Sequence, residues 1–130
     1  MKTTHINKII YKFIGRKLCF AVENKGLLTL NSANVICLND NYDAFFVCAI
    51  LNSRITQLFF EDSYDTHKVL KNHIKSFYIP NFEKKIVLKI SGIAKNQIGK
   101  NNYCEDIEDI IYSELGLNDN QVNYLRARFP

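Results

Sequence analysis

The sequence lacks tryptophan and holds only two prolines and five glycines among its 130 residues. With so little proline and glycine, and with 47% hydrophobic residues, most of the chain is expected to fold rather than stay disordered. No segment approaches the roughly 20 apolar residues that a membrane span needs, and residues 1–5 lack the apolar segment of a signal peptide. We therefore expect one globular domain of ordinary size, located in the cytoplasm and not in a membrane.

Sequence motifs of catalysis are missing as well. The glycines are isolated and no Gly-x-Gly occurs, which excludes the glycine-rich turn that binds S-adenosylmethionine and the loop that cradles phosphates. The only prolines, Pro80 and Pro130, do not form the Asn/Asp-Pro-Pro-aromatic loop of an enzyme that methylates amino groups of DNA. We expect no catalytic residue and no cofactor in this chain.

Residues that bind metals are present without the spacing of a metal site. Three acidic residues, Glu61, Asp62 and Asp65, are expected to lie in a solvated loop, although they leave a small metal-dependent nuclease open as an alternative. The three histidines have no cysteine or carboxylate at ligand spacing, so we expect no metal. The cysteines lack the short intervals of zinc and redox motifs and are expected to be reduced, buried thiols: Cys19, Cys37, Cys48 and Cys104.

Positive charge is concentrated in parts of the chain. The net charge is +4, which is too small to prove a polyanionic partner. Residues 1–25, however, contain five lysines and one arginine against the single acid Glu23. A second basic segment covers Lys68–Lys75, whereas Glu105–Asp119 contains six acids and no base. Any surface for a polyanion is therefore expected in the first two of these segments.

The first part of the sequence has the pattern of β-strands. Short runs of β-branched and aromatic residues predict four strands at Lys8–Ile14, Lys17–Val22, Leu27–Leu30 and Val35–Leu38. The connections between them are too short for crossover helices, which favours an antiparallel meander. Residues 23–26, which end in glycine, are typical of a hairpin turn.

The rest of the chain is predicted to be helical. Apolar residues at helical spacing predict one long helix from Ala44 to about Phe60 and a short helix at His67–Ser76. A third helix is expected to be capped by Asn81 and to run to about Gln97, with Ile86, Ile90 and Ile93 on one face. A fourth is predicted at Glu105–Leu115, ended by Gly116, and a last helix begins with a capping box of Asn118 and Gln121. The predicted fold class is α+β, an N-terminal antiparallel β-meander followed by a helical C-terminal half. We expect a single domain in which residues 1–80 form the strand-rich core and residues 81–130 form helices packed on it.

Several segments, taken in order, resemble a known family. They are the basic strand pair at Lys8–Leu18, the Asn31-Ser32 step within Leu30–Ile36, the Leu-Asn-Ser step within Ala49–Arg54, the basic stretch that leads from Lys68 to Phe77-Tyr78-Ile79-Pro80, and the acidic helix at Ile107–Leu117. Their order is similar to that of the TaqI-like C-terminal specificity domain of adenine-specific DNA methyltransferases and of fused restriction–modification enzymes. The likeness extends from about Lys8 to Leu125 and departs from the family at Phe77-Tyr78-Ile79-Pro80, which has only one proline.

The resemblance implies a target-recognition domain that binds double-stranded DNA and is not catalytic by itself. S-adenosylmethionine would belong to the methyltransferase catalytic domain of the same chain or of a partner chain. Lysines suit phosphates, arginine suits guanine and asparagine suits adenine, which gives a set of DNA-binding candidates: Lys8, Lys12, Arg16, Lys17, Lys25, Asn31, Ser32, Arg54, Lys68, Lys71, Asn72 and His73. Each cation has a solvated surface position as its plain alternative, and Asn31-Ser32 has a turn or bulge. For Asn52-Ser53 we favour a structural contact at a helix end over a DNA contact.

A second class of function also fits the sequence. The apolar face of Ile86, Ile90 and Ile93 suits docking to a partner protein as well as it suits a core helix. A protein–protein interaction module that docks a partner through its C-terminal helices is therefore the alternative hypothesis.

Overall fold

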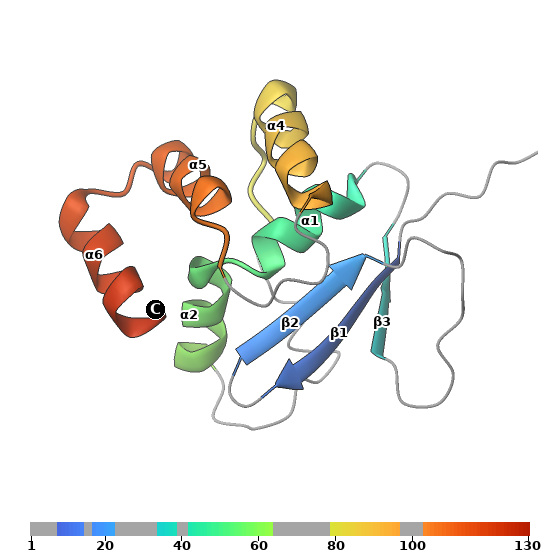
Figure 1. Cartoon of the computed structure of the whole chain (residues 1–130), viewed down its shortest axis with the longest axis horizontal. Coiled ribbons are helices and arrows are strands. Elements are labelled where there is room, and N and C mark those ends of the chain that lie inside the picture. Colours follow the sequence, from blue (N-terminus) through green and yellow to red (C-terminus); the bar gives the residue numbers. More distant parts are fainter. Residues whose placement is uncertain (1–7, 15–16, 23–33, 39–41, 64–78, 97–102) are drawn as a thin grey trace, which may run out of the picture.

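The computed structural model describes residues 8–14, 17–22, 34–38, 42–63, 79–96 and 103–130; for residues 12–14, 17–18, 34–37 and 63 it describes the backbone alone. Three strands come first in this part of the chain and are followed by helices, so the fold class is α+β, as predicted (Figure 1). The predicted turn at 23–26, the strand at Leu27–Leu30 and the helix at His67–Ser76 lie outside the described residues.

The strands form one antiparallel sheet. It contains β1 (Lys8–Ile14), β2 (Lys17–Val22) and β3 (Asn34–Cys37) in the order β2-β1-β3, which confirms three of the predicted strands. The pairing is antiparallel, as predicted, but the order is not that of the predicted meander, because β1 lies between β2 and β3. Alternation along the strands sorts their residues into two rows. Ile9 and Tyr11 of β1 and Phe20 of β2 are buried in the core, so their row faces the helices.

The single long helix predicted from Ala44 to Phe60 is wrong, because the segment forms two helices. These are α1 (Ala44–Leu51) and α2 (Arg54–Ser63), and the chain bends by 55° between them. Asp43 caps the first helix by accepting a hydrogen bond from the backbone N–H of Phe46 at 3.0 Å. No single helix in the described ranges is long and apolar enough to cross a membrane; only the bent pair reaches that length and composition together.

The break between α1 and α2 follows from the side chains of Asn52 and Ser53. The Asn52 amide accepts from the backbone N–H of Phe20 and donates to its carbonyl oxygen, each at 2.9 Å. The buried Ser53 hydroxyl donates to the Ile50 carbonyl at 2.6 Å and accepts from the N–H of Thr56 at 3.4 Å. These bonds occupy backbone groups at the end of one helix and the start of the next. Asn52-Ser53 therefore makes the structural helix-end contact that the sequence analysis favoured.

In the described part of the chain, three helices follow Pro80: α4 (Lys84–Lys95), α5 (Glu105–Leu115) and α6 (Asp119–Arg128). The predicted cap at Asn81 is wrong, because α4 begins after Glu83, whose side chain makes no capping bond. The end of α5 at Gly116 is confirmed, and its φ of 74° is the left-handed conformation that glycine adopts most readily. The capping box of Asn118 and Gln121 is confirmed as well.

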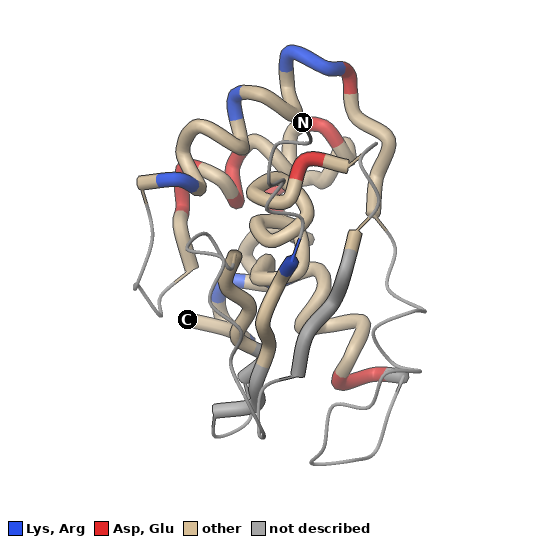
Figure 2. Tube along the Cα trace, turned by 90° about the vertical axis from the view of Figure 1, so that its right-hand side faces the viewer, with Lys and Arg blue, Asp and Glu red and all other residues tan. Residues whose placement is uncertain are grey.

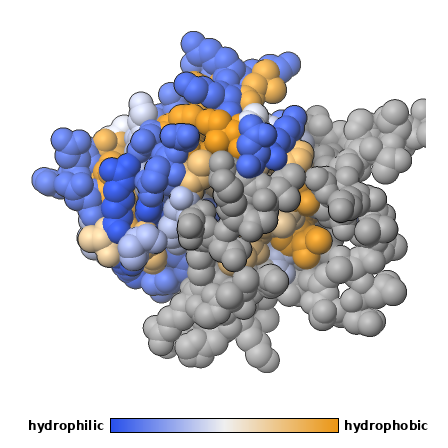
Figure 3. Space-filling model, in the orientation of Figure 1, coloured by the Kyte–Doolittle hydropathy of each residue, from blue (hydrophilic) through white to orange (hydrophobic). Residues whose placement is uncertain are grey.

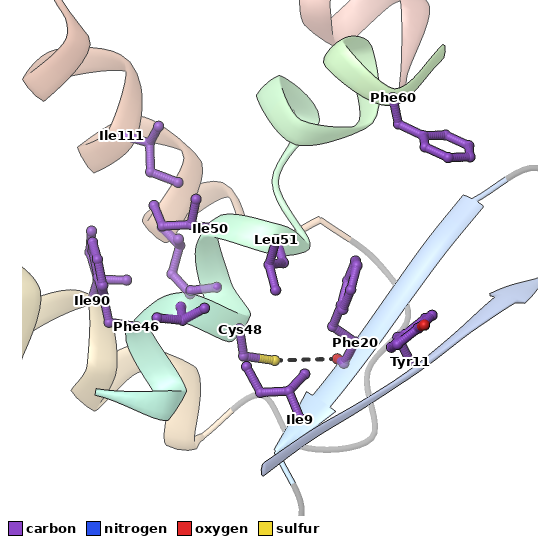
Figure 4. Packing of buried hydrophobic residues seen from close by; sticks show 13 residues of the cluster. Ile9, Tyr11, Phe20, Phe46, Cys48, Ile50, Leu51, Phe60, Ile90 and Ile111 are labelled. Atoms are coloured by element: carbon purple, nitrogen blue, oxygen red, sulfur yellow. Dashed lines mark hydrogen bonds between the residues drawn. The ribbon is translucent and has the colours of Figure 1, made fainter. Parts of the chain in front are cut away.

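The core surrounds α1. This helix lies between the sheet and α4 (Figures 1 and 4), and nearly all of its residues are buried. Ile90 of α4 and Ile111 of α5 belong to the same buried cluster as Ile9 and Phe20 of the sheet. Many side chains on the outer faces of the C-terminal helices are hydrophilic (Figure 3), although Leu88, Leu115 and Tyr124 are exposed as well. Helices α4 and α5 thus share a core with the strand-rich part, whereas the end of α6 packs in a second cluster of Tyr112, Leu125 and Phe129.

Candidate nucleic-acid interface

The described side chains do not carry the positive charge of the protein. They include eight of the 17 lysines and arginines but ten of the 13 aspartates and glutamates. The excess of cations therefore belongs to residues whose side chains are not described, most of them in the N-terminal 25 residues and in the segment 68–75. These are the two segments in which the sequence analysis expected a surface for a polyanion.

Three of the predicted cations lie in the sheet. Lys8 is exposed in β1 and pairs with Cys37 of β3, while Lys12 pairs with Cys19 of β2. Lys17 begins β2 and pairs with Ile14. By the alternation of a strand, these three positions belong to the row opposite the one that faces α1. Lys8 and Lys12 are four residues apart, which is about 13 Å along a strand.

The other predicted residues lie mostly outside the described ranges. Gly15 and Arg16, which separate β1 from β2 in the sequence, lie outside the described residues, and Arg16 stays a prediction. The structure gives no position for the rest of this set, and they stay predictions: Lys25, Asn31, Ser32, Lys68, Lys71, Asn72 and His73.

Arg54 is where the structure disagrees with the predicted site. Its side chain is 3% exposed, at the start of α2, and its guanidinium is held inside the protein. Nε donates to the backbone carbonyl of Phe129 at 2.6 Å, and the two terminal nitrogens donate to the carboxylate of Glu105. One of these nitrogens also donates to the Tyr112 hydroxyl at 3.0 Å. Arg54 therefore joins α2 to α5 and to the end of α6, and it does not face a base edge.

The pKa values of the two carboxyl groups around Arg54 shift in opposite directions. The hydrogen bond from Arg54 lowers the pKa of Glu105, which is half exposed. Glu108 is 2% exposed, and burial raises its pKa although the Tyr112 hydroxyl donates to it at 2.7 Å and the Arg54 backbone N–H at 3.2 Å. The Tyr103 ring stacks against the guanidinium, with 4.7 Å from Arg54 Cζ to the ring centroid, and burial raises the pKa of its hydroxyl to about 12. The cluster is a charged anchor between elements far apart in sequence.

The predicted acidic loop at Glu61 is also partly wrong. Glu61 and Asp62 lie in the last turn of α2, and both accept from Arg128 of α6, at 3.3 and 3.1 Å. Arg126 is paired in the same way with Glu105 and Asp109 of α5. Asp65 lies outside the described residues. Across the described part of the chain, no three residues among His, Cys, Asp and Glu come together in a group that could hold a metal ion.

The stripe proposed for docking a partner faces inward. Ile90 is completely buried, and Ile86 and Ile93 pack against the same core cluster. This position removes the feature on which the protein–protein alternative rested.

Apolar side chains also line a small pocket, with a volume of about 110 Å³, between α1, α2 and α5: Ile50, Ile55, Phe59, Pro80, Ile111 and Leu115.

The sequence analysis missed a row of lysines on α4. Lys84, Lys85, Lys89 and Lys95 are all exposed, and Figure 2 shows the positively charged positions spaced along this helix at the top of the view. The signal that would have found them is the absence of any acid between Glu83 and Glu105.

Comparison with protein families matches residues 1–82 to the TaqI-like C-terminal specificity domain. The match covers well over half of the chain and includes the sheet, α1 and α2. The chain therefore belongs to the family of TaqI-like C-terminal specificity domains, as its sequence motifs suggested. Helices α4, α5 and α6 lie beyond the matched residues. No curated protein and no solved structure matches the chain.

Proposed function

We propose that this protein is the target-recognition domain of a restriction–modification adenine methyltransferase. It binds duplex DNA and reads a short site, and it has no catalytic activity of its own. Methyl transfer, S-adenosylmethionine and the target adenine belong to a catalytic domain in the same chain or in a partner chain, in the cytoplasm. The observation that carries the proposal is the family membership of residues 1–82.

The distribution of charge supports the same function. The N-terminal segment contains most of the cations of the matched region, and the register of the sheet assigns Lys8, Lys12 and Lys17 to one row. Lysines at these positions would neutralise phosphates and fix the domain on the duplex. Arg16, Asn31 and Asn72 remain the candidates for reading base edges. Arginine can form two hydrogen bonds with guanine, and asparagine can form two with adenine.

The test is a fluorescence anisotropy titration of a labelled random-sequence duplex with the whole chain at several salt concentrations. Binding should weaken steeply as salt rises, because each phosphate contact contributes about 0.9 to the slope of log K against log salt. The double substitution Lys12→Gln and Lys17→Gln should make this negative slope shallower by about 1.8. The same counterion release corresponds to a loss of about 60-fold in affinity at 0.1 M salt.

The matched control is the double substitution Arg126→Gln and Arg128→Gln. It removes the same two positive charges, but both arginines are engaged by carboxylates of α2 and α5. It should leave the salt slope of binding close to that of the unsubstituted chain. An equal effect of the two double substitutions would mean that only net charge matters and would contradict the assignment of the sheet lysines. Absence of binding at low salt would contradict the proposed function itself.

A further inference from the structure

The outer face of α4 holds cations without acidic partners. Lys84, Lys85, Lys89 and Lys95 are exposed, and the ion pairs within the described residues use only Arg54, Arg126 and Arg128. No acid stands three or four positions from any of the four lysines along the helix. Lys95 has an aromatic neighbour, with its Nζ at 5.5 Å from the centroid of the Phe45 ring. The arginines of α6, by contrast, all face carboxylates.

Three of these lysines do not help α4 to form, whereas Lys95, in the last turn, is favourably placed at the negative end of the helix dipole. Lys84 and Lys85 occupy the first turn, where the positive end of the helix dipole disfavours cations, and no acid lies in that turn. Lys85 and Lys89 are a like-charge pair at the i, i+4 spacing, which also disfavours the helix. Since the charges of Lys84, Lys85 and Lys89 oppose the local structure and make no ion pair within the described residues, their role is better sought outside the fold.

A glycine lies on the same exposed side of the helix. Gly92 is exposed in the interior of α4, and a Cβ added there would meet no atom within 4 Å. Helix interiors disfavour glycine relative to alanine, and no neighbour within the described residues requires its small size. A glycine at such a position lets the backbone of a binding partner come closer to the helix than any side chain would.

We infer that the outer face of α4, defined by Lys85, Lys89, Gly92 and Lys95, is a second surface that binds the phosphate backbone of duplex DNA. The inference rests on the proposed function and extends it to residues beyond the family match. From Lys85 to Lys95 the helix rises about 15 Å, at 1.5 Å per residue. Duplex DNA carries about one charge per 3.4 Å of axis on each strand, so this length passes several phosphates. The surface carries no base-reading group in this set and would bind every sequence alike.

The experiment uses the same titration of a random duplex. It compares the double variant Lys85→Gln and Lys89→Gln with the control double variant Arg126→Gln and Arg128→Gln. The α4 pair should lower the salt slope by about 1.8 and the affinity by about 60-fold at 0.1 M salt, while the control stays near the unsubstituted chain. Far-UV circular dichroism should show that both variants keep their helices, since Lys85, Lys89 and Arg126 are exposed and Arg128 is only partly buried.

Gly92→Ala provides a test that changes no charge. Alanine should raise the thermal midpoint of unfolding, because it favours the helix. It should also weaken DNA binding without altering the salt slope, because its methyl group would separate the strand from the helix. A more stable variant with unchanged affinity would overturn the close approach at Gly92.

The outcomes separate this inference from the function on which it rests. If the unsubstituted chain binds DNA and the sheet lysines matter, but the α4 pair behaves like the control, the α4 surface is refuted and the proposed function stands. If the α4 pair matters and the sheet lysines do not, the α4 surface is supported and the N-terminal interface is refuted. A chain that binds no duplex at low salt overturns both.

Discussion

Replacing Arg54 with methionine should destabilise the protein more than any exposed substitution. The guanidinium donates to the Phe129 carbonyl, to Glu105 and to Tyr112, and it lies 3.8 Å from the carboxylate of Glu108. Methionine has a similar length and is apolar, so it fills much of the space but satisfies none of these acceptors. The carboxylate of Glu108, which is almost fully buried, would lose its only cation among the described residues.

The expected loss is about 3–5 kcal/mol, the usual cost of removing one member of a buried ion pair and leaving the other. The surface part of the cluster adds little, since Glu105 is half exposed and well solvated. The assay is urea unfolding followed by far-UV circular dichroism, because the chain has no tryptophan to report unfolding by fluorescence.

A double variant tests whether the loss of stability comes from the Glu108 carboxylate that is left without its cation. Adding Glu108→Gln to Arg54→Met removes the buried charge, so part of the lost stability should return. The reasoning would be refuted if Arg54→Met cost less than about 1 kcal/mol, the range of exposed ion pairs, with an unchanged dependence on urea.

Two further predictions concern single side chains. Asn52→Ala removes both hydrogen bonds to the Phe20 backbone and should cost about 1–3 kcal/mol in urea unfolding, because groups of the edge strand lose their partner; a neutral result would contradict the role of Asn52 as a clamp. For Glu108, burial raises the folded-state pKa above the ordinary value of 4.5, so the folded state holds its proton more tightly than the unfolded state. The stability of the unsubstituted chain relative to Glu108→Gln should therefore fall as pH rises from below 4.5 through the raised pKa, and a rise over this window would show that the ionised form is favoured in the fold.

Local patterns predicted the elements whose signals are local. Three elements have the predicted bounds: the strands at Lys8–Ile14 and Lys17–Val22 and the helix at Glu105–Leu115. Their signals are alternation, helical spacing and a terminal glycine, which depend only on residues close together in the sequence. The break after Leu51 was missed because Asn52 and Ser53 look like ordinary polar residues of a helix. At the break, the Asn52 side chain bonds the backbone of Phe20, 32 residues earlier in the chain, and Ser53 bonds the Ile50 carbonyl.

The predicted site shows more clearly that local patterns miss contacts between distant residues. In the sequence, Arg54 looks like a free cation beside Leu-Asn-Ser, but its partners Glu105 and Phe129 are 51 and 75 residues away. Burial of a charge depends on such distant partners, and a local pattern contains no record of them. Family motifs, in contrast, predicted the membership that the comparison confirmed, because their order along the chain is itself a property of the sequence.

The most direct measurement is the affinity of the whole chain for a random duplex at a series of potassium chloride concentrations. A domain that holds DNA by its phosphates should lose affinity along a straight line on logarithmic axes, with a steep negative slope. A flat line, or no complex even in dilute buffer, would mean that this member of the specificity-domain family does not hold DNA through its cations.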